Sequence, residues 1–310
     1  MSKYKVLAFY QFTDVADPHG EVLHHKTFCE ARDITARIYI SEYGINGQMS
    51  GSLKDTEAYI EWMSNHPIFS TVVFKMDDYH EHAFPRLTIK YRKQLVALDD
   101  PFDATKTGER LTPEQWKEKL DHPEGQILID VRNDYEWKVG KFQGATTPQC
   151  SSFREFREYA ENLQKKIDPR TTPILMYCTG GIRCEAYSAY LKDKGFQKVY
   201  QLEGGIINYG KKVGSKHWLG KLFVFDDRLT TPISNEKTEI IGTCKHCQTP
   251  SEAYYNCANM DCNELFLCCP SCLETFLGCC QTECKTAERL RPYHQQNPHK
   301  PFRKWYNYFK

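Results

Sequence analysis

A thiol, two glycines and a guanidinium stand close together in the segment Tyr177-Cys178-Thr179-Gly180-Gly181-Ile182-Arg183-Cys184. The segment follows a predicted strand and opens a predicted helix, which is where parallel α/β sheets bind ligands. Gly180 and Gly181 allow successive backbone N–H groups to converge, and the helix adds its positive N-terminal end. Arg183 adds a fixed charge. This field favours the thiolate of Cys178 and predicts a catalytic nucleophile, or a cradle for an anion or a persulfide.

Three neighbouring residues are candidates for supporting roles. Cys184 falls in the first turn of the predicted helix, where it is either a resolving thiol or a packed helix residue, and we favour packing. Asp130 and Arg132 follow a short apolar stretch that predicts a strand. We expect them to organise the sheet edge beside the Cys178 loop. A purely structural ion pair explains them at least as well.

Ten of the 14 cysteines crowd into residues 244–284. In a reducing compartment such a cluster indicates metal ligation rather than disulfides. Two C-x2-C pairs and two wider pairs supply eight thiolates, enough for two tetrahedral zinc ions. An interleaved pairing puts four ligands on each ion: Cys244, Cys247, Cys269 and Cys272 on one, and Cys257, Cys262, Cys280 and Cys284 on the other.

That pairing leaves Cys268 and Cys279 spare and makes His246 an alternative ligand. Structural zinc is the interpretation that we favour for this cluster. An iron–sulfur cluster is a second interpretation. A third is a reduced, partly buried module that binds metal weakly or not at all.

Two basic segments are candidates for contact with RNA. The net charge of the whole chain is only +1, so nucleic-acid binding has to come from local patches. Lys211, Lys212 and Lys216 follow a glycine-rich turn without an intervening acid. The tail from residue 285 to 310 interleaves basic and aromatic residues, which suit phosphate contact and base stacking. The alternative is a solvated face with tail aromatics that pack on the core.

The elements that position these residues fall into three segments, as 310 residues lead us to expect. Residues 1–99 predict a βαββαβ order, which is typical of a ferredoxin-like, acylphosphatase-like sandwich. Its strands are expected at 5–12, 34–40, 45–49 and 71–76, its helices at 20–33 and 55–65, and further strand at 86–98.

A polar stretch at 100–110 is the expected linker. In residues 111–225, predicted strands alternate with helices, which favours a parallel sheet with helices on both faces. The strands are expected at 126–130, 173–177 and 198–202, and the helices from Thr112, at 152–167 and at 183–195. Residues 226–310 form the cysteine-rich segment with its basic aromatic tail.

Neither a signal peptide nor an apolar run long enough to span a bilayer is evident, so we expect a cytoplasmic protein without a membrane partner. No flavin, haem or nucleotide motif stands out either. The composition is that of a globular chain, with 40% hydrophobic and 26% charged residues.

Three sequence pieces together resemble the rhodanese family. Ile129-Asp130-Val131-Arg132 with the downstream Glu136-Trp137 is similar to its N-terminal signature, and Cys178 to Arg183 is similar to its active loop. Glu203-Gly204-Gly205-Ile206 resembles the segment after its last strand. The resemblance implies a rhodanese domain at 111–225. Lys141 stands where the family often has histidine, and the loop is one residue shorter than in rhodanese-like phosphatases.

Over essentially the whole chain, the combination of domains is similar to the tRNA uridine hydroxylase family. The motif Ser41-Glu-Tyr-Gly-Ile-Asn-Gly47 and the cysteine-rich Asn256-Cys-Ala-Asn-Met-Asp-Cys262 contribute to this resemblance. It implies a tRNA substrate, dioxygen as co-substrate and conversion of the wobble uridine to 5-hydroxyuridine, with Cys178 as the catalytic cysteine. Two alternatives remain: a sulfurtransferase with a persulfide on Cys178, and a non-enzymatic RNA-binding scaffold.

Overall fold

The computed structural model describes residues 3–98 and 102–291. Residues 99–101, which include the start of the linker expected at 100–110, and the tail from 292 onward lie outside the described residues. Contacts group the chain into two compact units. Of the described residues, the first unit contains 3–98 and 102–107 with 185–193, and the second contains 108–184 with 194–291.

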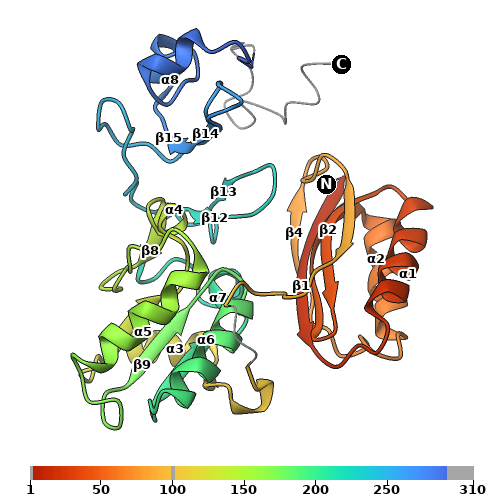
Figure 1. Cartoon of the computed structure of the whole chain (residues 1–310), viewed down its shortest axis with the longest axis vertical. Helices are drawn as coiled ribbons and strands as arrows, with labels where there is room; N and C mark the ends of the chain where they lie inside the picture. Colours follow the sequence, from red (N-terminus) through yellow and green to blue (C-terminus); the bar gives the residue numbers. More distant parts are fainter. Residues whose placement is uncertain (1–2, 99–101, 292–310) are drawn as a thin grey trace. The chain divides into compact units, whose positions relative to one another are not determined.

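The first unit is a five-stranded sheet with two helices on one face (Figure 1). Its strand order is β4-β1-β3-β2-β5, and neighbours are antiparallel except for β2 and β5. The order confirms the predicted ferredoxin-like sandwich, to which β5 adds an edge strand. In chain order the elements are β1 (Tyr4–Phe12), α1 (Pro18–Glu30), β2 (Ile34–Ser41), β3 (Gly44–Ser52), α2 (Leu53–Ser64), β4 (Lys75–Tyr79) and β5 (Leu87–Tyr91).

Local sequence signals start both helices of this unit. The Asp17 side chain accepts the N–H of Gly20 at the start of α1. The Ser52 hydroxyl accepts the N–H of Asp55 at 3.1 Å and caps α2. Such caps satisfy backbone donors that have no partner inside the helix.

One strand of the first unit begins later than its apolar pattern predicts. Residues 71–76 were expected to be a strand, but β4 begins only at Lys75. Val72 and Phe74 nevertheless pack against the apolar core, so burial explains the pattern without strand pairing. Of the stretch 86–98, only Leu87–Tyr91 is a strand.

The second unit contains a four-stranded parallel sheet with the order β6-β10-β9-β7. All four residues of β9 are buried, as expected for a strand inside a covered parallel sheet. A Thr112 capping box with Gln115 starts α3, as the sequence predicts. The elements are β6 (Glu109–Leu111), α3 (Pro113–Asp121), β7 (Ile127–Asp130), α4 (Asp134–Trp137), β8 (Gly140–Phe142), α5 (Phe156–Gln164), β9 (Ile174–Tyr177), β10 (Val199–Leu202) and α7 (Gly205–Lys212). The helix α6 (Ile182–Asp193) begins in this unit, and its residues 185–193 group with the first unit.

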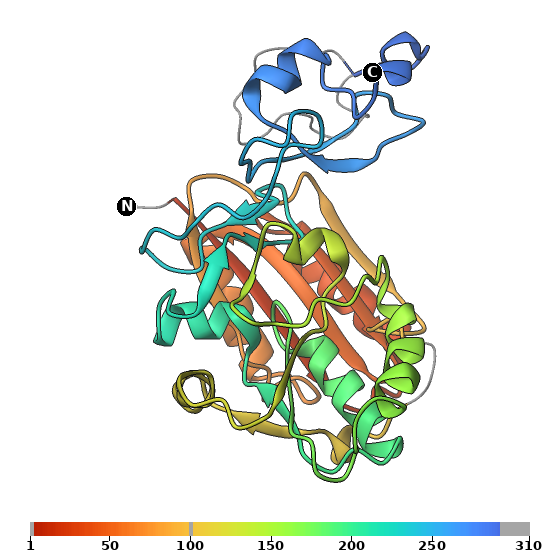
Figure 2. The same ribbon diagram turned by 90° about the vertical axis from the view of Figure 1, so that its left-hand side faces the viewer.

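Short paired strands follow α7 and lead into the cysteine-rich segment, which Figure 2 shows in blue. β11 pairs with β8, β12 with β13, and β14 with β15, each pair antiparallel. The remaining elements are β11 (Trp218–Gly220), β12 (Leu222–Phe223), β13 (Thr230–Thr231), β14 (Tyr254–Asn256), β15 (Leu265–Leu267), α8 (Pro270–Thr275) and the 3-10 helices η1 (Ala104–Lys106), η2 (Phe153–Glu155) and η3 (Thr282–Thr286).

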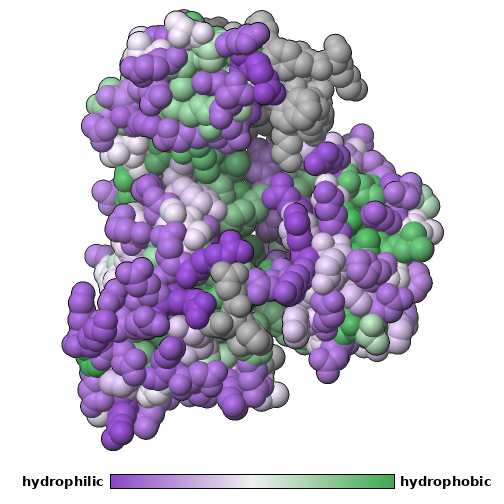
Figure 3. Space-filling model, in the orientation of Figure 1, coloured by the Kyte–Doolittle hydropathy of each residue, from purple (hydrophilic) through white to green (hydrophobic). Residues whose placement is uncertain are grey.

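Large apolar side chains form separate buried clusters in the two units. The surface that faces the viewer in Figure 3 is mainly hydrophilic. Within the described ranges, no helix combines the length and the apolar character needed to cross a membrane.

Candidate active site and cysteine clusters

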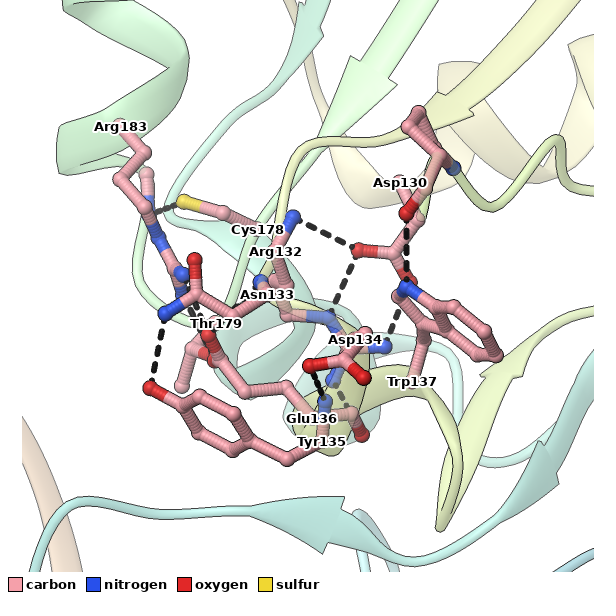
Figure 4. Close-up of polar contacts among 12 residues, drawn as sticks. Asp130, Arg132, Asn133, Asp134, Tyr135, Glu136, Trp137, Cys178, Thr179 and Arg183 are labelled. Carbon is pink, nitrogen blue, oxygen red and sulfur yellow. Dashed lines mark hydrogen bonds and ion pairs between the residues drawn. The ribbon is translucent and has the colours of Figure 1, made fainter. Parts of the chain in front are cut away.

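Cys178 lies just after β9, in the loop that leads into α6 (Figure 4). The residue is only 1% exposed. The backbone N–H of Gly181 donates to Cys178 Sγ at 3.1 Å. Gly181 adopts a φ of +105°, which L-residues rarely adopt, so a glycine suits the turn by which the loop leads into α6.

The surroundings of Cys178 stabilise its thiolate. Burial by itself raises the pKa of this thiol, but other contributions outweigh it: the hydrogen bond from the Cys184 thiol, the charge of Arg183, and the backbone N–H groups of Cys184 and Gly181. Together they lower the pKa of Cys178 from 9.0 to about 5. Most of the sulfur is therefore a nucleophilic thiolate at neutral pH.

Arg183 is held by a carboxylate that the sequence reasoning did not select. Glu136, on α4, is fully buried and pairs with both terminal nitrogens of Arg183, one of them at 2.8 Å. The Thr179 hydroxyl donates to the same carboxylate at 3.3 Å, and the N–H of Asn133 donates at 3.1 Å. Figure 4 shows these groups converging on Glu136. The only sequence signal for Glu136 is its place in the rhodanese-like signature.

The first turn of α7 braces the Cys178 loop from another side. The N–H of Ile206 donates to the Cys178 carbonyl at 3.0 Å, and the N–H of Ile207 donates to the Thr179 carbonyl at 3.2 Å. Gly205 has a φ of +68°, and a Cβ there would lie 2.6 Å from the Cys178 carbonyl oxygen. A glycine at position 205 is thus required for the close approach of these two backbones.

Asp130 and Arg132 form a fully buried ion pair at 2.6 Å. Arg132 also donates to the Gly140 carbonyl at 2.6 Å, and its guanidinium lies 5.4 Å from the Trp218 ring centre. These contacts tie β7 to β8 and β11. The geometry agrees with the structural ion pair that was one of the two interpretations of these residues.

Cys184 is fully buried in the first turn of α6, and its thiol donates a hydrogen bond to Cys178. The structure therefore brings the two cysteines together. Its burial agrees with the packed helix residue that the sequence favours, and its role as a resolving thiol stays a prediction.

The three candidate RNA-binding lysines lie at the far end of α7 from the Cys178 loop. Lys211 and Lys212 are exposed in its last turn, roughly 10 Å along the helix axis from Gly205. Lys216 pairs with Asp121 at 2.7 Å, and the same carboxylate binds Lys117 and His217. Although the sequence next to Lys216 contains no acid, folding brings Asp121 of α3 to it.

The cysteine-rich module, residues 244–284, brings its thiols together in two groups of four. In each group the sulfur atoms all lie within 4.8 Å of one another, and each group can hold a metal ion. The groups have the same members as the predicted pairing. They are Cys244, Cys247, Cys269 and Cys272, and Cys257, Cys262, Cys280 and Cys284.

The remaining candidates in this module lie outside both groups. The His246 ring stacks on Phe276 with 3.7 Å between ring centres, and its Nε2 contacts the Cys279 carbonyl. Cys268 and Cys279 are buried. Four cysteine sulfur atoms within 4.8 Å of one another match the soft, tetrahedral donor set that zinc prefers.

The lowered pKa gives a direct prediction for the reactivity of Cys178. We expect its alkylation by iodoacetamide to rise with pH through a midpoint near 5, because the thiolate forms on that limb and is lost below it. Arg183→Gln should move the midpoint upward. Peptide mass spectrometry measures each cysteine separately, and Cys150, whose pKa burial raises to about 11, is the internal control. A midpoint for Cys178 at pH 9 or above would show that the thiol is not ionised at neutral pH and would contradict the prediction.

Three family models match successive parts of the chain. They are the UPF0176 acylphosphatase like domain at residues 4–95, the rhodanese-like domain at 112–212 and the rhodanase C-terminal domain at 219–285. Their order agrees with the two folds described above and with the cysteine-rich module that follows.

Similarity to curated proteins extends over nearly the whole chain. The tRNA uridine(34) hydroxylase of Protochlamydia amoebophila is 62% identical, over 98% of this chain and 95% of that protein. Those of Chlamydia pneumoniae and Chlamydia trachomatis serovar D are 53% and 51% identical, over 97% of this chain and 94% and 92% of the relatives. Since identity at this level spans all of the folded regions, the chain belongs to the tRNA uridine(34) hydroxylase family.

Proposed function

We propose that this protein hydroxylates the wobble uridine of tRNA to 5-hydroxyuridine, with dioxygen as co-substrate and Cys178 as the catalytic residue. The observation that carries the proposal is the Cys178 thiolate, with a pKa of about 5, in a loop braced by Glu136, Arg183 and α7. Relatives named as tRNA uridine(34) hydroxylases supply the substrate. A tRNA substrate and many reduced thiols fit a cytoplasmic protein.

The role of Cys178 follows from the chemistry of uracil. The thiolate adds to C6 of the ring, a carbon–sulfur bond forms, and the electron pair of the C5–C6 double bond shifts so that C5 becomes nucleophilic. C5 then takes one oxygen atom from dioxygen, while a two-electron reductant from outside the chain, together with protons, converts the other oxygen atom to water. Loss of the C5 proton and departure of the Cys178 thiolate from C6 restore the double bond. Arg183, the Gly181 amide and the hydrogen bond from the Cys184 thiol stabilise the thiolate before attack. A wobble uridine lies in a single-stranded loop, so little energy is needed to extrude it.

A sulfurtransferase remains the second candidate, because the Gly181 amide that stabilises a thiolate also suits a persulfide on the same sulfur. The two functions leave different products on tRNA. Nucleoside mass spectrometry of tRNA from cells that lack the protein separates them: loss of 5-hydroxyuridine supports hydroxylation, and loss of a thionucleoside supports sulfur transfer. A scaffold without enzymatic activity would leave both unchanged.

We predict that Cys178→Ser reduces 5-hydroxyuridine in tRNA to the level of cells without the protein, because a serine hydroxyl stays protonated at neutral pH. Cys184→Ser should reduce it less. Cys150→Ser is the matched control, since Cys150 is also buried but lies outside the loop. Full modification by Cys178→Ser would refute a catalytic role for Cys178. Equal, complete loss in the Cys178 and Cys184 variants would indicate a thiol–disulfide pair.

We propose that the two four-cysteine groups hold structural zinc. Four thiolates fill a tetrahedral zinc site and leave no position for substrate, which is typical of zinc that stabilises a fold. Elemental analysis of protein purified without added metal should give about two zinc ions per chain. Cys247→Ser and Cys262→Ser, one from each group, should each lower the content by about one. Iron together with acid-labile sulfide in their place would indicate an iron–sulfur cluster. Folded, active protein without metal would refute the proposal.

We further propose that Lys211, Lys212 and Lys216 contact phosphates that flank the extruded uridine. Each neutralised phosphate contributes roughly 0.7 to 0.9 to the slope of log affinity against log salt. Changing all three lysines to glutamate should weaken tRNA binding and flatten that slope, with Lys216 contributing least because Asp121 already pairs with it.

The matched control for this triple variant has the same change in charge at another place. Lys165, Lys166 and Arg170 are exposed before the start of β9, at the sheet edge opposite Cys178. A salt titration of tRNA affinity should separate the two triple variants. If both behave like the unmodified protein, the RNA surface lies elsewhere.

A further inference from the structure

The cysteine-rich module makes a direct hydrogen bond to the element that carries Glu136. The hydroxyl of Tyr254, on β14, donates to the backbone carbonyl of Tyr135 at 2.6 Å. Tyr254 is 4% exposed, so water does not compete strongly for this carbonyl. Tyr135 immediately precedes Glu136 in α4. This hydrogen bond joins residues that are 119 positions apart in the sequence. Its acceptor is one residue before Glu136, whose carboxylate holds Arg183 and Thr179.

A second path of contacts joins the same two ends. The Tyr254 ring packs edge-on against Phe223, with 5.5 Å between ring centres. Phe223 contacts the rings of Tyr135 and Phe225 at 5.2 and 5.4 Å. The guanidinium of Arg183 lies 5.7 Å from the centre of the Phe225 ring. Tyr254 thus reaches Arg183 through packed aromatic rings as well as through the backbone of α4.

Both strands at this contact run directly into the four-cysteine groups. β14 ends at Asn256 and is followed by Cys257, while β15 ends at Leu267 and Cys269 lies two residues beyond. Tyr254 and Leu267 belong to one buried apolar cluster with Val139 and Phe223. Ligation of these cysteines would fix the two strands, and the strands fix the position of the Tyr254 hydroxyl.

We propose that Tyr254 is a positioning residue through which the cysteine-rich module holds Glu136, and with it Arg183 and Thr179, in place around Cys178. The inference rests on the proposed function only in that positioning Cys178 would then serve tRNA modification. Tyr254 itself touches no reacting atom. It acts by keeping the Glu136 carboxylate where it can orient the Arg183 charge toward the loop.

The test is the pH dependence of Cys178 alkylation in Tyr254→Phe, which removes one hydroxyl and leaves the ring packing. Without this hydrogen bond the Glu136 carboxylate is held less firmly, so the midpoint of Cys178 alkylation should rise by about half a pH unit. Tyr209→Phe is the matched control: Tyr209 is fully buried, and its hydroxyl donates to the Lys216 carbonyl at 2.7 Å, away from the loop. An equal shift in both variants, or no shift in Tyr254→Phe, would overturn the proposal.

A double-mutant cycle identifies the route. If Tyr254 acts through Glu136, the shift caused by Tyr254→Phe should vanish in a Glu136→Gln background. Should Glu136→Gln fail to fold, Arg183→Lys provides the second background. A shift that persists undiminished in the folded background contradicts the route. Alkylation needs no tRNA, so these results are independent of nucleoside analysis, which alone decides whether the protein hydroxylates uridine.

Discussion

The pairing of Glu136 with Arg183 is the interaction on which the geometry of the Cys178 loop depends. A fully buried carboxylate is tolerated because it receives hydrogen bonds from Arg183, Thr179 and the backbone of Asn133. Removing either charge would leave the other largely buried without the opposite charge that it pairs with, which is far more costly than losing a surface ion pair. The pair therefore locks α4 to the start of α6, and the loop between β9 and α6 has little freedom to relax.

That rigidity matters because burial by itself would keep the Cys178 thiol protonated. Burial raises the pKa of the sulfur, and only donors already aimed at it, the Cys184 thiol and the amides of Cys184 and Gly181, together with the charge of Arg183, reverse the direction. A flexible loop would let these donors turn away, and the thiol would regain its proton. Bracing by the first turn of α7, with no room for a Cβ at Gly205, serves the same end from the opposite side.

What the sequence predicts well here is what local spacing determines. The Cys178 loop and the Thr112 cap follow from residues a few positions apart, and the ferredoxin-like order follows from the alternation of elements. The grouping of the cysteines follows from their short pairs, such as Cys244 with Cys247 and Cys269 with Cys272, taken in an interleaved order. Glu136 was missed as a site residue because its partners lie 43 and 47 residues away, and nothing local marks a glutamate in a short helix as buried. The same limit applies to the lysines: the local sequence shows no acid near Lys216, and only folding brings Asp121 to it.

The contact at Tyr254 suggests why a cysteine-rich module accompanies a rhodanese-like domain at all. β14 and β15 have three residues each, too few to form a stable hairpin by pairing alone. Metal ligation at both ends of such short strands can supply the missing stability without a large apolar core. The module then presents a rigid edge to α4, and a rigid edge is what a buried ion pair beside a reactive thiolate requires.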